Sequence, residues 1–245
     1  GHYVITTGPY AIVRHPMYLG VVLMFLAGLE IDFNQVRQRG ARGLASALFI
    51  CCAVLGMAGA GTGERARAEG VAIARENLLA LRDRVQGAFG RVDVVLSNVG
   101  IGFFGPFEEV DLEKANRCFE INVTGTAAVL QAFVPHMRER GSGRLIVMSS
   151  LVGQIPFPFE SIYAASKFAV EGLVLSLRYE VEPFGIEVAL IQPAQVSTSF
   201  AAKIHTLPPE GSPYRERAGR FIRRDEELIL GAPDPATAAA EIVKV

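Results

Sequence analysis

A short apolar run that leads through polar residues into a helix constrains this fold more than any other stretch. The run Leu145–Met148 has the length and apolar content of a buried strand. Ser149 and Ser150 follow it, and a connection containing glycine and proline leads to Tyr163 and Lys167. Helical residues four positions apart share one face, so Tyr163 and Lys167 are predicted to stand one above the other. The pattern predicts an α/β unit with polar side chains at the end of a strand.

A tyrosine paired with a lysine one helical turn away has a chemical use. A free tyrosine titrates near pH ~10 and exchanges protons poorly at neutral pH. The ammonium of Lys167 is expected to favour the phenolate of Tyr163 and to lower its pKa. The Ser150 hydroxyl beside it could hold a substrate oxygen during proton exchange. These residues suit the interconversion of an alcohol and a carbonyl, with the hydride carried by a cofactor.

The whole stretch resembles the active-site segment of the short-chain dehydrogenase/reductase family. The resemblance rests on Ser150, Tyr163 and Lys167 at the family's spacing and extends over about residues 71–245. It implies a Rossmann-like, doubly wound parallel sheet and an oxidoreductase that uses NAD or NADP, with the choice between these cofactors left open. It also implies that Tyr163 is the acid/base, that Ser150 orients the carbonyl, and that Lys167 holds the nicotinamide ribose.

Two further landmarks of the family precede this stretch. The apolar run Val92–Leu96 predicts a parallel strand, and it leads into a turn that contains Asn98 and Gly100. By the resemblance, Asn98 and Gly100 lie against the cofactor. A long helix is expected over Leu112–Ala132, and the resemblance implies that its Asn122 kinks the helix and holds a water of the proton relay.

Another predicted strand, Ile186–Ile191, follows the helix that carries the tyrosine. Open α/β sheets place their ligands at the carboxyl ends of the strands, so the residues after Ile191 are candidates for cofactor binding. The resemblance assigns Pro193, Val196 and Thr198 to the place where the nicotinamide carboxamide is held.

Residues 199–230 are expected to be less regular and, by the resemblance, to cover the substrate. Their Phe200, Ile204 and Leu207 suggest an apolar alcohol or carbonyl substrate, although core packing explains these side chains equally well. Beyond them, Asp234 followed by a proline predicts the start of a final helix.

The first part of the chain differs from the rest. Two apolar runs, Met17–Leu29 and Leu44–Ala60, flank a polar and basic connector. They are interpreted as helices, and their length suits a membrane hairpin, an interfacial anchor or a pair of buried soluble helices about equally. The chain is therefore divided into an apolar helical segment, residues 1–62, and a dehydrogenase-like Rossmann domain, residues 63–245, which is expected to lack its N-terminal unit and to be incomplete at both ends.

The segments Gly8–Tyr10 and Val13–Gly20 resemble membrane methyltransferases of the isoprenylcysteine and phospholipid type. In that family a stretch like the one around Arg14 and His15 leads into a membrane helix and helps to hold S-adenosylmethionine. The downstream glutamate pair of that family is not recognisable. The preferred interpretation is a remnant joined to another reading frame, with methyl transfer as an alternative.

A glycine-rich run, Gly56–Gly63, is the candidate for a dinucleotide-binding loop. Its distance to Asn98 is too short for the two further β-α units that the family has there. The run is therefore interpreted as a flexible junction. This leaves a second hypothesis, that the chain is a catalytically inactive fusion or fragment without a dinucleotide-binding loop.

Composition excludes several other classes of function. The formal net charge of -1 gives no sign of a nucleic-acid partner. Cys51, Cys52 and Cys118 form neither a disulfide framework nor a metal-binding pattern, so no metal is expected. Reduced cysteines indicate a cytoplasmic protein, with membrane contact through residues 17–60 left open. The family resemblance also implies a homo-oligomer.

Overall fold

The structure, a computed structural model, describes residues 47–50, 64–198, 200 and 204–243. Within these residues the strands are β1 (Ala47–Ile50), β2 (Val94–Ser97), β3 (Gly143–Met148) and β4 (Ile186–Ile191). The α-helices are α3 (Glu64–Phe89), α4 (Leu112–Phe119), α5 (Thr126–Arg140), α6 (Ser161–Val181), α8 (Arg215–Leu230) and α9 (Pro235–Val243). Short turns are η3 (Phe107–Glu109), the π-helical η4 (Glu120–Gly125), η5 (Leu151–Gly153) and η6 (Glu182–Phe184).

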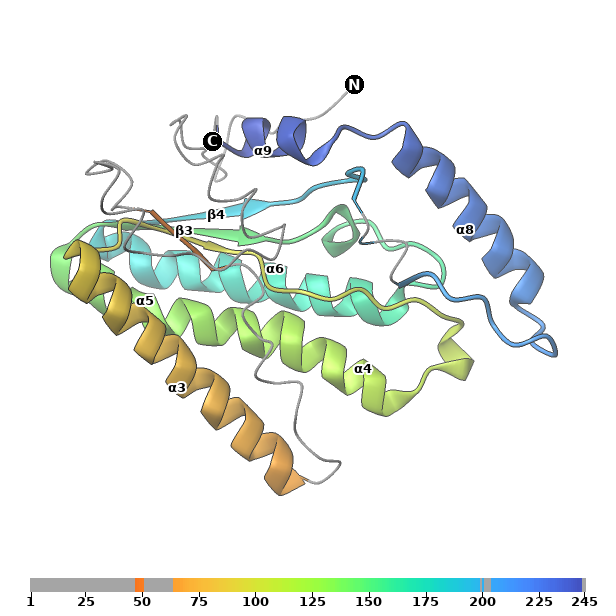
Figure 1. The fold of residues 1–245 in the computed structure, drawn as a ribbon, viewed down its shortest axis with the longest axis horizontal. Coiled ribbons are helices and arrows are strands. Elements are labelled where there is room, and N and C mark those ends of the chain that lie inside the picture. Colours follow the sequence, from red (N-terminus) through yellow and green to blue (C-terminus); the bar gives the residue numbers. More distant parts are fainter. Residues whose placement is uncertain (1–46, 51–63, 199, 201–203, 244–245) are drawn as a thin grey trace.

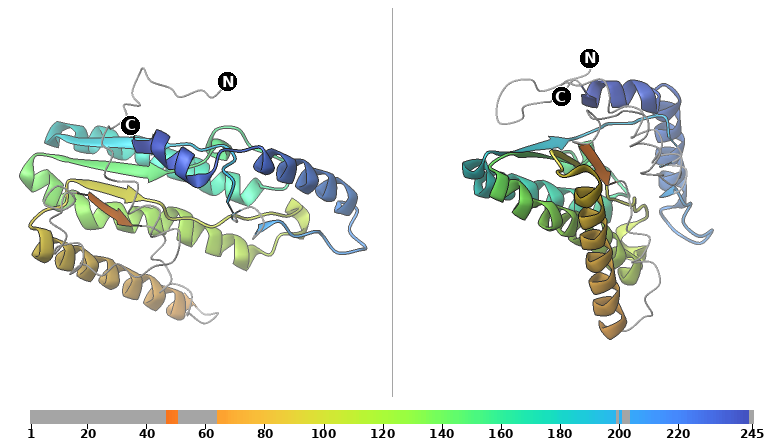
Figure 2. Two further views of the ribbon diagram at one scale, coloured as in Figure 1. Left: turned by 45° about the horizontal axis from the view of Figure 1, so that its top comes forward. Right: turned by 60° about the vertical axis from the view of Figure 1, so that its left-hand side comes forward.

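The strands form a parallel sheet in the order β1-β2-β3-β4. At its centre, Leu145 of β3 pairs with Val95 of β2 and with Val188 of β4. Parallel strands need crossover connections, which α4 and α5 supply between β2 and β3, and α6 between β3 and β4. Helices α3, α5 and α6 lie on one face of the sheet and α9 on the other, as Figures 1 and 2 show. This arrangement confirms the predicted Rossmann-like α/β fold.

The hydrophobic core lies between the sheet and helices α5 and α6. Strands covered on both faces read as nearly continuous apolar runs, which explains the composition of β2 and β3. Each large side chain in this layer stabilises the fold by roughly 1.5–3 kcal/mol through burial. The most deeply buried members are Phe133, Met137, Leu145, Ile186, Val95, Val129, Val147, Val170 and Val174.

The helix predicted over residues 44–60 is wrong where the structure describes that run. Ala47–Ile50 is strand β1, and it pairs in parallel with Val94–Ser97. A short apolar run cannot be assigned to a strand or a helix by periodicity alone, and the free edge of β2 decides the outcome here. The rest of 44–60 lies outside the described residues. So do Met17–Leu29, Arg14, His15, Cys51, Cys52 and Gly56–Gly63.

None of the helices in the described part of the chain combines the length and the apolar character that crossing a membrane requires.

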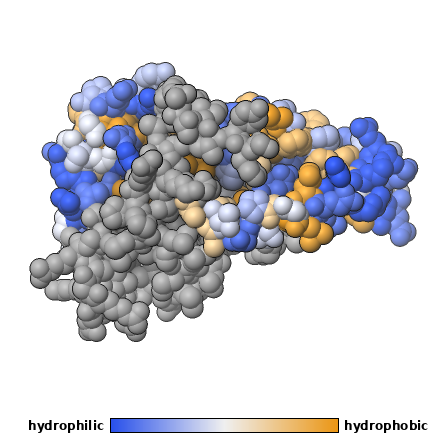
Figure 3. Space-filling model, turned by 90° about the horizontal axis from the view of Figure 1, so that it is seen from above, coloured by the Kyte–Doolittle hydropathy of each residue, from blue (hydrophilic) through white to orange (hydrophobic). Residues whose placement is uncertain are grey.

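Two further helix predictions need correction. The helix expected over 112–132 is divided into α4 and α5 by the π-helical turn Glu120–Gly125. The segment 199–230 is less irregular than expected, because α8 occupies Arg215–Leu230. Ion pairs one turn apart, such as Arg220 with Glu216, support this charged helix. The right-hand end of the molecule in Figure 3, where α8 lies, is mostly hydrophilic.

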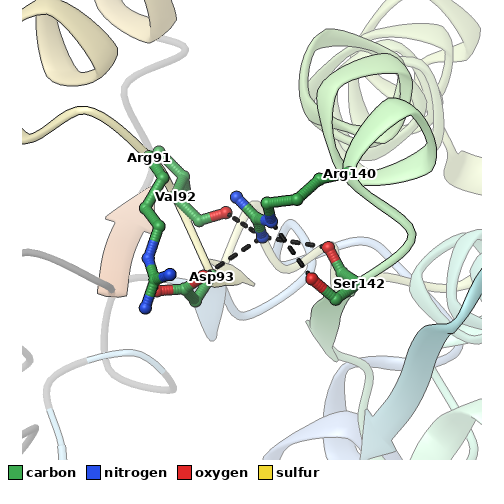
Figure 4. A network of polar contacts seen from close by, with 5 residues as sticks. All are labelled: Arg91, Val92, Asp93, Arg140 and Ser142. Carbon is green, nitrogen blue, oxygen red and sulfur yellow. Dashed lines mark hydrogen bonds and ion pairs between the residues drawn. The ribbon is translucent and has the colours of Figure 1, made fainter.

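At the amino-terminal edge of the sheet, one arginine joins the starts of two strands (Figure 4). Arg140 donates 2.9 Å hydrogen bonds from Nη2 to the carbonyl oxygens of Val92 and Ser142. Its Nε donates to Ser142 Oγ at 3.1 Å, and Nη2 forms a 3.2 Å ion pair with Asp93 Oδ1. The second oxygen of Asp93 lies 3.1 Å from Arg91 Nε as an ion pair. The network fixes β2 and β3 at the edge away from the predicted site.

Candidate active site

The predicted site lies at the carboxyl edge of the sheet, where the chain leaves β3 and β4. Ser149 N donates to Ile191 O at 2.7 Å, and Leu151 N donates to Pro193 O at 2.9 Å. These bonds extend the pairing of β3 and β4 past the ends of both strands. They hold the segment that carries Ser150 beside the segment that begins at Pro193.

The structure places Tyr163 and Lys167 in the first turns of α6, as the sequence predicts. The backbone of both residues is helical, and both side chains are buried. Lys167 Nζ lies 5.9 Å from the centre of the Tyr163 ring and donates to Met148 O at 3.0 Å. The ammonium therefore links the helix to the end of β3, beside the phenol.

The predicted lowering of the Tyr163 pKa is wrong in this structure. Burial raises the pKa of Tyr163 to about 12, because the phenolate would be poorly solvated. The hydrogen bond with Ser150 lowers the pKa, and the nearby Glu160 and Cys118 raise it. Desolvation is the largest contribution to this pKa, because Tyr163 is only 8 % exposed.

Asn122 lies in the π-helical turn between α4 and α5, in line with the predicted kink. Its side chain is fully buried, and its Oδ1 accepts from Ile101 N at 2.7 Å. Its Nδ2 donates at 2.9 Å to both Ile101 O and Ser166 Oγ. Ser166 Oγ in turn donates to Tyr163 O at 2.7 Å. The amide thus connects the helix turn to the backbone of the tyrosine, and π-helical turns occur frequently at functional sites.

The loop after β2 brings the other predicted residues to the same edge. Asn98 follows β2 directly and is half-buried. A Cβ added at Gly100 would lie 3.4 Å from both Asn122 Oδ1 and Lys167 Nζ. Gly100 therefore keeps a side chain out of the space beside the lysine.

The segment after β4 is tied by a backbone hydrogen bond to the connection between α8 and α9. Ser197 N donates to Pro233 O at 3.0 Å, and Thr198 N donates to Val196 O at 2.7 Å. Val196 is half-buried and Thr198 is exposed. The structure thus places Pro193, Val196 and Thr198 at the same carboxyl edge as the tyrosine.

An apolar layer covers the loop beside the tyrosine. A Cβ at Gly102 would lie 2.6 Å from Ile204 Cδ1 and 3.1 Å from Phe200 Cζ, so a larger residue there would displace these side chains. The rings of Phe200 and Tyr163 are 6.0 Å apart. Of the three predicted covering residues, Phe200 therefore lies close to the phenol, and Ile204 packs over Gly102. Leu207, the third, is 47 % exposed.

Sequence reasoning missed a buried acidic cluster next to the tyrosine. Glu160 precedes α6 and is 8 % exposed. Burial, followed by the charge of Asp225, raises the pKa of Glu160 to about 7. Asp225 accepts from Gln195 Nε2 at 2.9 Å, and its other oxygen lies 3.4 Å from His205 Nε2. These residues are far apart in the sequence, so no local pattern could have shown the cluster.

Aromatic rings enclose this cluster. Phe104 contacts Phe159, Phe221 and His205 with centroid distances of 5.8, 5.8 and 5.1 Å. Phe159 has a φ of 66°, a conformation that a bulky residue rarely adopts. The ring contacts and a 2.8 Å bond from Gly105 N to Phe159 O hold it there. No group of three metal-ligating side chains occurs among the residues that the structure describes.

Comparison with known proteins now identifies the family. The family model described as short chain dehydrogenase matches residues 60–207. This chain belongs to the short-chain dehydrogenase family. The matched range includes Asn122, Ser150, Tyr163 and Lys167.

Several curated dehydrogenases are similar over part of the chain. Human 17-beta-hydroxysteroid dehydrogenase type 1 is 42 % identical over 135 residues, 55 % of this chain and 40 % of that protein. Retinol dehydrogenase 8 of Bos taurus is 38 % identical over 120 residues, 49 % of this chain and 38 % of that protein. The chain thus spans about two fifths of the length of these two relatives.

Solved structures support the fold of this short-chain dehydrogenase. A short-chain dehydrogenase from Streptomyces avermitilis has a TM-score of 0.59 and 29 % identity, covering 86 % of this chain and 78 % of that chain. NAD+-bound xylitol dehydrogenase also has a TM-score of 0.59, covering 74 % of this chain and 78 % of that chain. Its identity of 21 % supports the fold alone.

Proposed function

We propose that this chain is the catalytic part of an oxidoreductase that interconverts an alcohol and a ketone or aldehyde with NAD or NADP. The main support is the convergence of Ser150, Tyr163 and Lys167 at the carboxyl edge of a parallel sheet, in a member of the short-chain dehydrogenase family. Carboxyl edges are where open α/β sheets bind their ligands.

In this proposal Tyr163 exchanges a proton with the substrate oxygen. Its pKa of about 12 keeps the phenol protonated at neutral pH, which suits proton donation during carbonyl reduction. Ser150, which hydrogen bonds to the phenol, orients the same substrate oxygen. Lys167 provides a fixed positive charge beside the developing negative charge. The water that the family resemblance assigns to Asn122 remains a prediction.

The residues at this edge fit a nicotinamide cofactor, which would supply or accept the hydride. The Ser97 hydroxyl is buried at the end of β2 and has no hydrogen-bond partner among the described residues, and such an atom favours an external polar partner. Gly100 adds no side chain beside Lys167 Nζ. The residues proposed to hold the cofactor are Asn98, Gly100, Tyr163, Lys167, Pro193, Val196 and Thr198.

The substrate is proposed to be an apolar alcohol or its carbonyl product. Phe200 and Ile204 place apolar surface over Gly102, and the Phe200 ring lies 6.0 Å from the Tyr163 ring. Two relatives are named for a hydroxysteroid and for retinol. Estradiol and retinol are therefore suitable probes.

The test measures turnover of estradiol and retinol with NAD+ and with NADP+, using wild type, Tyr163→Phe and Tyr179→Phe. Tyr179 lies on the same helix but is 75 % exposed, so its variant is a matched control. We expect Tyr163→Phe to lower turnover by about 10³-fold or more, because proton transfer to the substrate oxygen is lost. Tyr179→Phe should stay within about twofold of wild type.

Turnover that survives Tyr163→Phe would contradict the assignment of the acid/base. Oxidation should also accelerate between pH 7 and 10, because the phenol must be deprotonated to accept a proton and its pKa lies at about 12. A wild-type protein that binds neither cofactor, as judged by nicotinamide fluorescence, would favour the inactive fragment instead.

A further inference from the structure

A buried glutamate, Glu171, lies close to the residues of the proposed active site. Glu171 lies on α6 one helical turn beyond Lys167 and is 7 % exposed. Buried carboxylates are costly unless both oxygens are well hydrogen bonded. Here Oε2 accepts from Gln192 Nε2 at 2.9 Å, and Oε1 has no hydrogen-bond partner among the described residues. Such an oxygen in a native protein calls for an explanation, and a role in a functional site is one of the known ones.

The unpartnered oxygen faces the turn that follows Ser150. A Cβ at Gly153 would lie 3.1 Å from Glu171 Oε1 and 2.9 Å from Ser149 Oγ. Ser149 Oγ is itself buried, and no described residue hydrogen bonds to it. The two orphaned oxygens therefore approach the same point, and the glycine leaves it free of side-chain atoms.

The other oxygen holds the second loop of the site. Gln192, its donor, directly follows β4 and precedes Pro193. Pro193 O accepts from Leu151 N at 2.9 Å, which joins this loop to the turn after Ser150. Glu171 thus holds the Gln192–Pro193 loop by a hydrogen bond from the helix that carries Tyr163, and its other oxygen lies beside the turn after Ser150.

We propose that Glu171 is a positioning residue that holds the Ser149–Gly153 turn and the Gln192–Pro193 loop in register with Tyr163. This inference rests on the proposed function. It extends that function by assigning to Glu171 the alignment of Ser150 with the phenol. Glu171 does not touch the reacting atoms, so its effect reaches the substrate through Gln192 and the turn.

The first measurement does not need a substrate. Hydrogen–deuterium exchange compares wild type with Glu171→Leu and with Glu180→Leu, whose side chain is exposed on the same helix. We expect Glu171→Leu to accelerate exchange at least about fivefold in peptides covering 149–154 and 192–196, because the amide of Leu151 lies between the two loops. Exchange elsewhere, and throughout Glu180→Leu, should match wild type.

Unchanged exchange in a folded Glu171→Leu protein would overturn the inference. So would equal acceleration across the whole chain, because that is the result of general destabilisation. If Glu171→Leu does not fold, Gln192→Leu removes the donor instead and should accelerate exchange in the same two peptides. Glu171→Gln keeps an oxygen acceptor for Gln192, so it should restore the wild-type pattern.

The second measurement uses kinetics with estradiol and NADP+ or NAD+. Glu171→Leu should lower kcat by about 10- to 100-fold and change cofactor affinity, followed by nicotinamide fluorescence, by less than about threefold. A purely structural glutamate would leave kcat of the folded fraction unchanged, and that outcome contradicts the inference. Absence of wild-type turnover would count against the proposed function, while the exchange data still decide the role of Glu171.

Discussion

The polar groups at the two edges of the parallel sheet differ in their hydrogen bonding. At the amino-terminal edge, Arg140 donates to Val92 O, Ser142 O and Ser142 Oγ and pairs with Asp93. At the carboxyl edge, Ser97 Oγ and Ser149 Oγ are buried and have no hydrogen-bond partner among the described residues. At the amino edge, Asp93 Oδ2 likewise accepts no hydrogen bond from these residues, but it forms an ion pair with Arg91. Hydrogen-bonded networks rigidify a fold, whereas a buried polar atom without a partner costs stability. We therefore predict that the amino edge contributes mainly to stability and that the carboxyl edge, in the proposed function, binds ligands.

Lysine substitution at the carboxyl edge should show the largest effect. We expect Lys167→Met to reduce turnover by about 10³-fold, because the buried ammonium beside Tyr163 is lost. The free energy of unfolding should change by less than about 1 kcal/mol, because methionine fills the same volume without a buried charge. Urea unfolding and initial rates measure the two quantities. Lys114→Met, at an exposed site, is the control.

The second prediction concerns the amino edge, where a substitution should lower stability and leave turnover nearly unchanged. Arg140→Met should lower the free energy of unfolding by about 2–3 kcal/mol, because several hydrogen bonds to a charged group are lost together. The kcat of the folded protein should remain within about twofold. The exposed Arg138→Met variant should shift stability by less than about 0.5 kcal/mol. A tenfold fall in kcat for Arg140→Met would break the division of roles between the edges.

The third prediction concerns the pH dependence of stability. The pKa of Glu160 rises from 4.5 to about 7 on folding, so the native state binds the proton more tightly than the unfolded state. Its contribution is fully present below pH 4.5 and is lost as the pH rises from there through 7, at a cost of about 3 kcal/mol.

Glu160→Gln tests this, because a neutral amide relieves repulsion by Asp225. The variant should lack this loss between pH 5 and 8 and be more stable than wild type at pH 8. Urea unfolding at several pH values measures the slope, with Glu180→Gln as the exposed control. An unchanged slope in Glu160→Gln would show that other groups govern it.

The smallest effect is expected at Asp111, whose carboxylate hydrogen bonds to backbone amides. Asp111 caps α4 by accepting from Glu113 N at 2.9 Å and from Lys114 N at 3.3 Å. Asp111→Ala should lower the free energy of unfolding by about 1 kcal/mol and leave kcat unchanged. Asp111→Asn, which can still cap the helix, should recover most of the loss. A fall in the kcat of folded Asp111→Ala would contradict this prediction and would show that α4 also affects the site.

Local patterns predicted much of the fold and the site. Strand β4 has the predicted bounds, and the helix cap at Asp234 is confirmed by bonds from Ala236 N and Thr237 N. Tyr163 and Lys167 were predictable because a helix alone fixes their spacing. Glu171 continues that helical face and could have been noticed, although its partner Gln192 could not.

Other features depended on contacts between distant residues. Strand β1 forms because β2 offers a free edge, and the sequence of residues 47–50 suits a helix equally well. The cluster of Glu160, His205 and Asp225 joins three separate segments. No periodicity within one segment reveals such a contact.

The sequence by itself determined the order of strands and helices and the spacing of the serine, tyrosine and lysine, because these follow from neighbours along the chain. The tertiary structure decided the environment of those side chains. The pKa of Tyr163 rises because distant segments exclude water from the phenol, and solvation is a property of the packed fold.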